Sequence, residues 1–121
     1  MRLLPVGFCV LALAGASAFA QTNATPAYLV AEFTVTDAAT SKAWGEKAFS
    51  VVKAHGGTFL AGRAKASAVV GDPPEYVTIV RFESMDKATT YINSAETKAL
   101  APERDKSGKF RTYIVEGAGS P

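Results

Sequence analysis

The sequence has 121 residues, of which 48% are hydrophobic and 20% are charged, and its formal net charge at pH 7 is +2. So small an excess of positive charge gives no electrostatic basis for binding nucleic acid or an anionic membrane, and we expect neither partner. The whole chain contains one histidine and one cysteine. That is too few for a typical zinc site, which takes several nitrogen or sulfur ligands, and we expect no metal and no cofactor.

The first twenty residues are typical of a secretory signal peptide. They carry one positive charge at Arg2, an apolar stretch from about Leu3 to Ala14, and small residues up to Ala20, a layout that predicts cleavage after Ala20. The apolar stretch is shorter than the roughly 20 residues that a transmembrane helix needs. We therefore expect a periplasmic or secreted protein with no stable membrane anchor. Cys9 would leave with the signal peptide, so the mature chain would contain no disulfide and no cysteine nucleophile.

The rest of the chain is long enough for one domain. Residues 21–26 are mostly small or polar and predict a flexible leader. About a hundred residues can enclose one hydrophobic core, and we expect a single domain over residues 27–117. Residues 118–121 are expected to form a loose tail.

The first half of the domain alternates between strand and helix patterns. Apolar residues at every second position predict a strand over residues 28–35. Asp37 is a good N-cap for the long helix that follows, which helical spacing predicts to end at Gly56. A second strand is expected to begin at Thr58 and to continue, or to turn back as a hairpin, through to Val70, before a turn at residues 71–74.

The second half repeats this order with a broken helix. A strand is predicted over residues 76–82, followed by a helix with Ser84 as its N-cap. We expect a short second helical piece from Ala95 to about Leu100, ending near Pro102 because proline disfavours a helix interior. A charged loop should follow at residues 104–109, and a last strand at 110–116.

The order strand, helix, strand, strand, helix, strand is that of the ferredoxin-like βαββαβ fold of the α+β class. In this plan both helices cover one face of an antiparallel sheet. The predicted strands carry apolar or aromatic residues on both sides, so the second face also needs a cover. A second copy of the chain is the simplest cover, which predicts a homodimer.

Short motifs along the domain occur in a characteristic order. They are Ala27-Tyr28-Leu29-Val30, Gly56-Gly57-Thr58-Phe59-Leu60 with Arg63, Gly71-Asp72, Arg81-Phe82-Glu83-Ser84, Asn93-Ser94-Ala95-Glu96, Arg104, and Val115-Glu116-Gly117. Together they resemble the domain-of-unknown-function 1330 family of the dimeric α+β barrel superfamily. The resemblance implies a homodimer whose two sheets face each other around a central space. It implies no particular reaction, because the superfamily includes cofactor-independent oxygenases, haem proteins, isomerases and dehalogenating enzymes.

The single histidine has two interpretations. His55 stands in the last turn of the predicted long helix, directly before Gly56 and Gly57. A histidine followed by glycine is favourable at a helix C-terminus, and this interpretation needs no chemistry. Alternatively, His55 points into a pocket and serves as an acid or base, since histidine exchanges protons near neutral pH. A haem is conceivable through this residue as a single axial ligand.

Two arginines are further candidates. Arg63 and Arg81 lie at strand positions in apolar surroundings. Such an arginine either pairs at the surface with a neighbouring carboxylate, for example Glu32, or reaches the central space of the barrel and holds a carboxylate or phenolate there. The second alternative predicts a small anionic organic ligand. The candidate catalytic residues are therefore His55, Arg63 and Arg81.

Five residues are candidates for lining a ligand site. Tyrosines in strands and helices either pack or line such a space, and a carboxylate and an arginine could complete it, the arginine alternatively pairing with Glu96 or Glu103. The candidates are Tyr28, Glu32, Tyr76, Tyr91 and Arg104.

Three functions follow from these alternatives. The first is an exported homodimeric α+β barrel protein that binds a small apolar or weakly acidic organic molecule. The second is a cofactor-free enzyme, oxygenase-like or isomerase-like, in which His55 or a tyrosine accepts a proton and Arg63 or Arg81 stabilises developing negative charge. The third is a structural dimer with a filled interior and no ligand. The sequence leaves open whether the protein is an enzyme.

Overall fold

A computed structural model describes residues 25–118 of the chain. The predicted signal peptide, Cys9 included, lies outside these residues, as do most of the predicted leader and most of the predicted tail. No helix within residues 25–118 is both long enough and apolar enough to cross a bilayer.

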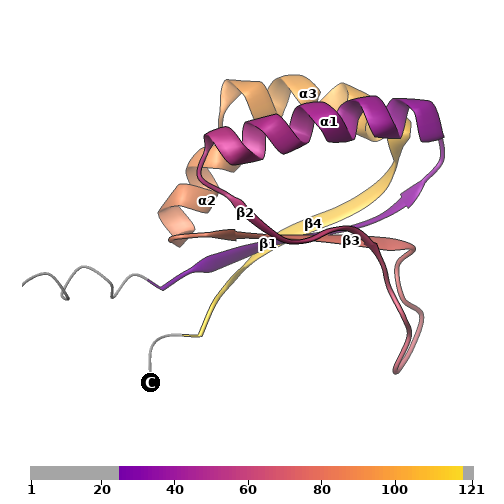
Figure 1. The fold of residues 1–121 in the computed structure, drawn as a ribbon, viewed down its shortest axis with the longest axis horizontal. Coiled ribbons are helices and arrows are strands. Elements are labelled where there is room, and N and C mark those ends of the chain that lie inside the picture. The colour runs from indigo at the N-terminus through magenta and orange to yellow at the C-terminus, as the bar shows by residue number, and fades with distance from the viewer. Residues whose placement is uncertain (1–24, 119–121) are drawn as a thin grey trace, which may run out of the picture.

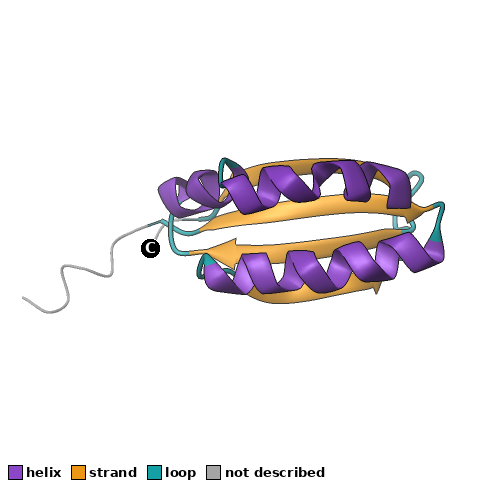
Figure 2. Cartoon of the chain, turned by 90° about the horizontal axis from the view of Figure 1, so that it is seen from above, coloured by secondary structure: helices purple, strands orange, loops and turns teal. Residues whose placement is uncertain are grey.

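The described residues form one antiparallel sheet with all helices on one face (Figures 1 and 2). The strands lie in the order β2-β3-β1-β4. This is the predicted ferredoxin-like α+β arrangement, with the second helix of the plan divided in two. The elements are β1 (Ala27–Val35), α1 (Ala38–Ala54), β2 (Thr58–Lys65), β3 (Tyr76–Phe82), α2 (Met85–Ile92), α3 (Ala95–Ser107) and β4 (Gly108–Glu116).

β1 is one of the two central strands of the sheet and has a partner strand on each side. Leu29 lies between Val80 of β3 and Ile114 of β4, and its side chain points toward the helices. The alternation expected from the sequence is present, since every second residue of β1 from Ala27 to Phe33 is buried. These residues form the core together with Val80 and side chains of the helices.

The ends of α1 follow the signals in the sequence. The Asp37 side chain accepts a hydrogen bond from the backbone N–H of Thr40 at 3.0 Å, which satisfies one of the free donors of the first turn. At the other end His55 caps the helix. Gly56 then adopts a φ of 82°, a left-handed conformation that favours glycine and stops the helix.

β2 is shorter than the sequence predicted. It ends at Lys65, which pairs with Tyr76, and residues 66–70 do not continue the strand. The prediction was wrong because a strand needs a partner. Pro73 and Pro74, on the returning side of the loop, have no N–H to donate to one.

α3 is longer than the sequence predicted. It continues through Pro102 to Ser107, where a charged loop was expected. The stabilisation from tertiary contacts exceeds the cost of the backbone hydrogen bond that Pro102 cannot donate. The Ser107 carbonyl accepts hydrogen bonds from the N–H groups of Thr36 and Asp37 at 3.0 and 3.2 Å. Gly108 follows because a Cβ there would lie 2.2 Å from the Thr34 carbonyl oxygen.

No helix of residues 25–118 covers the second face of the sheet (Figure 1). Alternation places Val30 of β1 on this open face, between Ile79 of β3 and Tyr113 of β4. Several large apolar side chains are substantially exposed there, including Tyr113 at 41% and Val115 at 43%. The open face therefore carries exposed apolar side chains, as the sequence predicted, and it also carries the charged residues Glu32, Arg81 and Arg111.

Candidate functional site

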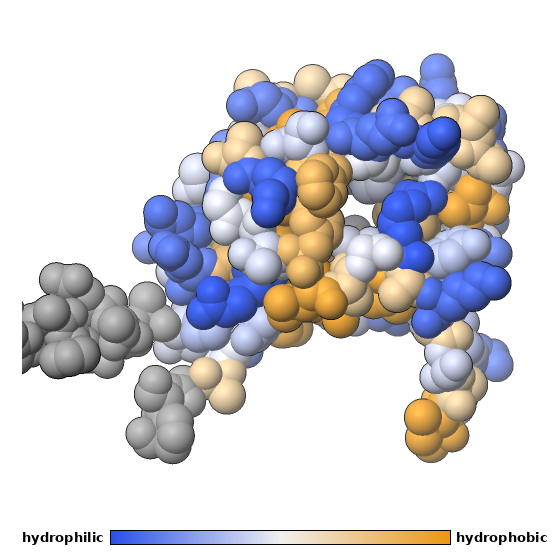
Figure 3. Space-filling model, in the orientation of Figure 1, coloured by the Kyte–Doolittle hydropathy of each residue, from blue (hydrophilic) through white to orange (hydrophobic). Residues whose placement is uncertain are grey.

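Two adjoining cavities lie between the helices and the sheet, each of about 80 Å³. One is beneath α3 and the other is beneath α1. Figure 3, which looks onto the α1 and β2 side, shows a hollow between the helix layer and the sheet. The space exists partly because alanines stand where larger residues would fill it. The residues shared by both cavities are Leu29, Ala31, Trp44, Ala48, Tyr91 and Phe110.

Beneath α3 the cavity has polar groups at one side. Tyr91, Thr97 and Arg104 line it together with apolar residues of α3 and β4. Burial raises the pKa of Tyr91, while the Thr97 side chain and the charge of Arg104 act in the opposite direction. Tyr91 is therefore protonated at neutral pH, and its hydroxyl is suited to donate a hydrogen bond.

Beneath α1 the cavity is bordered by Arg63. The Arg63 guanidinium donates a hydrogen bond through Nη2 to the buried Ser41 hydroxyl at 2.7 Å. Its Cζ lies 5.2 Å from the ring centroid of Phe33, within the range of a cation–π contact. Within residues 25–118 no carboxylate forms an ion pair with this guanidinium. Most of its donors are thus free for a ligand.

An unusual backbone conformation aims Arg63 at the cavity. Its φ is 48°, which is uncommon for a residue other than glycine. The pairing of β2 with β3 shifts register on both sides of Ala61, and bulges of this kind redirect side chains. The Arg63 N–H donates to the Thr78 hydroxyl at 2.9 Å, which holds the strained conformation in place. Strain of this kind often occurs at functional sites.

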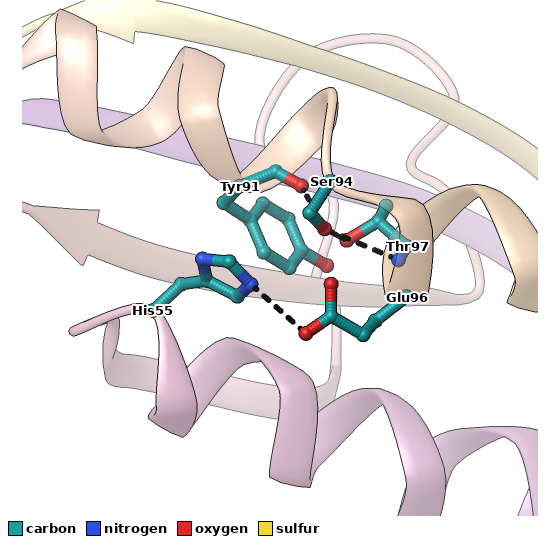
Figure 4. Close-up of polar contacts among 5 residues, drawn as sticks. All are labelled: His55, Tyr91, Ser94, Glu96 and Thr97. Carbon is teal, nitrogen blue, oxygen red and sulfur yellow. Dashed lines mark hydrogen bonds and ion pairs between the residues drawn. The ribbon is translucent and has the colours of Figure 1, made fainter.

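His55 lines neither of these two cavities, but it borders a separate, open hollow on the surface together with Ser84, Asp86 and Lys87. Its Nε2 is 3.9 Å from a Glu96 carboxylate oxygen, and its ring meets the Tyr91 ring edge to face at 5.9 Å (Figure 4). The backbone N–H of His55 closes the last turn of α1. The helix-ending interpretation therefore accounts for its position.

Three of the sequence candidates lie on the opposite side of the sheet. Tyr28, Glu32 and Arg81 belong to the open face, as the strand register shows. Glu32 accepts hydrogen bonds from the Tyr113 hydroxyl and from Nη2 of Arg111, both at 2.5 Å. Tyr113, and to a smaller extent Arg111, hold the pKa of Glu32 below its ordinary value of 4.5.

Two expected pairings are wrong. Glu32 pairs with Arg111, and neither Arg63 nor Arg81 forms an ion pair with it in the part of the chain that the structure describes. Arg104 pairs with its neighbour Asp105 at 2.9 Å. The expected partners of Arg104 are engaged elsewhere, since Glu96 faces His55 and Glu103 binds Lys47.

The structure thus brings together three of the eight candidates, Arg63, Tyr91 and Arg104, around the helix-side cavities. Tyr76 lies on the same sheet face but stacks on Phe33 at 5.6 Å without lining them. Sequence reasoning missed Ser41 and Thr97 because a lone hydroxyl in a helix gives no signal. Arg111 could have been found once the register of β1 and β4 was known, since it stands directly opposite Glu32.

The chemistry available in the cavities is that of hydrogen-bond donors around an apolar space. Among the described residues, no histidine, cysteine or carboxylate lines either cavity. Within residues 25–118, no group of three or more histidine, cysteine, aspartate or glutamate side chains is placed to hold a metal ion. The donors suit a ligand that carries an acceptor or a negative charge.

Fold and cavity together define a ferredoxin-like α+β protein with an open sheet face. The chain belongs to the family described as Domain of unknown function (DUF1330), whose model matches residues 26–118. No curated protein matches the sequence.

Solved structures share the fold at low sequence identity. A protein of unknown function from Rhodopseudomonas palustris is 14% identical with a TM-score of 0.63, covering 89% of this chain and 96% of that one. A dimeric protein of unknown function with a ferredoxin-like fold from Bacteroides fragilis is 10% identical with a TM-score of 0.54, covering 75% and 95%. SnoaB, a cofactor-independent oxygenase from Streptomyces nogalater, is 17% identical with a TM-score of 0.51, covering 80% and 97%.

Proposed function

We propose that this protein is an exported homodimer that binds a small, largely apolar organic molecule with an acidic group between its helices and its sheet. The apolar open face and the dimeric relative support the homodimer. The cavity lining supports an apolar ligand body, because most of its residues are aliphatic or aromatic.

The proposal depends mainly on the position and the contacts of the Arg63 guanidinium. A guanidinium at the border of an apolar cavity, with one neutral hydrogen-bond partner and no ion-pair partner among the described residues, is suited to a carboxylate or phenolate. The strained backbone that aims it there would be hard to explain if the side chain served solubility alone.

The test compares a small acid with its neutral analogue. Benzoate and benzyl alcohol have the same ring, and purified protein is titrated with each by calorimetry. We expect benzoate to bind more tightly, and Arg63→Gln to weaken benzoate by about tenfold or more, since hydrogen bonds to charged groups contribute about 1.5–3 kcal/mol.

Arg81→Gln is the matched control, because Arg81 lies on the open face and should leave benzoate affinity unchanged. Equal affinity for the acid and the alcohol would contradict the role of Arg63. If only Arg81→Gln weakens benzoate binding, the ligand site lies on the open face and not in the helix-side cavities. Absence of binding by either compound at millimolar concentration would favour the structural dimer without ligand.

The cofactor-free enzyme is the second candidate, and the shared fold with SnoaB favours it. Such an enzyme needs a group that accepts a proton. Tyr91 is unsuited because burial raises its pKa, and His55 lines neither cavity. The groups around the cavities therefore support binding more strongly than catalysis.

Export is part of the proposal and rests on the first twenty residues alone. N-terminal sequencing of the protein from its native host should begin at Gln21, and the protein should occur in the extracytoplasmic fraction. A chain that keeps Arg2 and remains in the cytoplasm would contradict it.

A further inference from the structure

Residues 66–75 form an arm that leaves the body of the molecule between β2 and β3. In Figure 1 the arm extends below the sheet, on the side opposite the helices. Val69 and Val70, near its end, are each 94% exposed, and no other large apolar side chain in residues 25–118 is as exposed. Figure 3 shows the end of the arm as a hydrophobic projection.

The base of the arm is held in a defined direction. The Val35 N–H donates to a Glu75 carboxylate oxygen at 2.9 Å, which ties the base to the end of β1. The Ala66 N–H donates to the Glu75 carbonyl at 3.4 Å. Pro73 and Pro74 further restrict the returning leg by fixing φ. The base of the arm therefore leaves the sheet in a defined direction.

The length of the arm matches a second sheet stacked on the open face. A leg of five residues spans up to about 16 Å, whereas stacked sheets lie about 10 Å apart. The end of the arm would thus pass the plane of such a sheet and lie against its edge.

The open face alone offers a small interface. Four strands of seven to nine residues span an area on the order of 500 Å² at ordinary strand spacing. A specific protein interface buries roughly 800 Å² on each partner. The arm supplies additional apolar surface on the same side of the sheet.

We propose that the arm clasps a second copy of this chain, with Val69 and Val70 buried against the partner when two open faces stack. The inference rests on the homodimer of the proposed function and adds a defined contact to it. Between Lys65 and Glu75 the arm carries a single charge, on Asp72, which suits an apolar protein surface. In a two-fold dimer each copy gives one arm and receives one.

The test measures dimer dissociation by sedimentation over a dilution series. The double variant Val69→Ser/Val70→Ser should raise the dimer dissociation constant by at least about tenfold. In the wild type the two valines would bury their apolar surface when the dimer forms, and the serines would lose that stabilisation. Met85→Ser is the control, since Met85 is an exposed apolar residue of α2 on the helix side and should change nothing.

Two outcomes distinguish a failure of the proposed arm contact from a failure of the proposed homodimer. A wild-type protein that sediments as a monomer at all concentrations overturns the dimer and the arm contact together. A wild-type dimer whose dissociation constant is unchanged in the double variant overturns the arm contact alone.

A second measurement identifies the partner of the arm directly. A photo-crosslinking amino acid replaces Val70, and isotope-labelled and unlabelled chains are mixed before irradiation. Crosslinked peptides that join a labelled chain to an unlabelled one are expected. Crosslinks confined to single chains overturn the proposal.

Discussion

Glu32 is the acceptor at the centre of a polar cluster on the open face of the sheet. Its pKa is lowered below 4.5 by hydrogen bonds from Tyr113 and Arg111. A carboxyl group with a lowered folded-state pKa contributes stability that is fully present above its unfolded pKa. That contribution is lost as the pH falls through the folded-state value.

We therefore expect the free energy of unfolding to fall below about pH 4.5, and to fall less in Glu32→Gln than in the wild type. Urea denaturation between pH 6 and pH 3 measures this difference. Glu46→Gln, at an exposed position of α1, should keep the wild-type acid dependence. Identical acid dependence in Glu32→Gln and the wild type would show that the cluster does not contribute.

Arg63 has an unfavourable backbone conformation, and its side chain borders the cavity. It is the one non-glycine residue of positive φ within residues 25–118. Left-handed backbone costs an L-residue roughly 1–2 kcal/mol relative to its preferred conformations, and glycine escapes this cost. The stability difference between two side-chain deletions at this position therefore measures the strain.

Arg63→Gly should be more stable than Arg63→Ala by up to about 1 kcal/mol, after the greater freedom of glycine in the unfolded chain is subtracted. Ala64→Gly is the control, because the next residue of β2 has no positive φ and glycine should destabilise it by roughly 0.5–1 kcal/mol. Urea denaturation of the three variants supplies the comparison. If the alanine variant is as stable as the glycine variant, the backbone at position 63 is not strained.

At the scale of the elements, α1 forms one wall of the helix-side cavities through small residues. Ala48 faces both cavities, and a larger side chain there would occupy the space of a ligand. Ala48→Leu should weaken benzoate binding by more than about tenfold while the chain stays folded, because the added methyl groups enter existing space and need not displace packed atoms.

Calorimetry measures the affinity, and circular dichroism checks the fold. Ala99→Leu, at an exposed position of α3, is the matched control and should bind as the wild type does. If Ala48→Leu binds benzoate normally, the ligand does not occupy the space between the helices and the sheet.

The course of the chain was predictable where local signals agree with tertiary partners. The alternation of β1, the Asp37 cap and the stop at Gly56 are properties of short segments, and the structure has all three. Pro102 gave an equally clear local signal, and the prediction was wrong. Contacts between Ser107 and the start of α1 keep α3 helical beyond it, and they join residues about 70 positions apart.

The candidate site was predictable only in part for the same reason. Arg63 was recognised as an arginine in an apolar strand, but its direction depends on a register shift that no local pattern reveals. The division of the candidates between two faces of the sheet depends on the same register. Residue type therefore suggested the chemistry, and only the fold showed which residues share one space.

At the scale of the whole molecule, the sheet separates two surfaces for which we propose different roles. The helix-side face encloses the cavities, and the open face with the arm forms the proposed dimer contact. In a dimer closed through the open faces, each cavity belongs to one subunit and lies on the outer side of its own sheet. Substitutions on one face should therefore leave the function of the other unchanged.

Val30→Lys tests this separation at the middle of the open face. Val30 stands between Ile79 and Tyr113, so a lysine there would lose its hydration if two sheets stack. The nearby Glu32 already binds Arg111 and Tyr113 and would not fully offset that cost. The variant should sediment as a monomer at concentrations where the wild type is a dimer. It should also keep its circular dichroism spectrum and bind benzoate through the helix-side cavity. Ala99→Lys on the outer surface of α3 should remain dimeric, and a dimeric Val30→Lys would show that the sheets do not meet at this face.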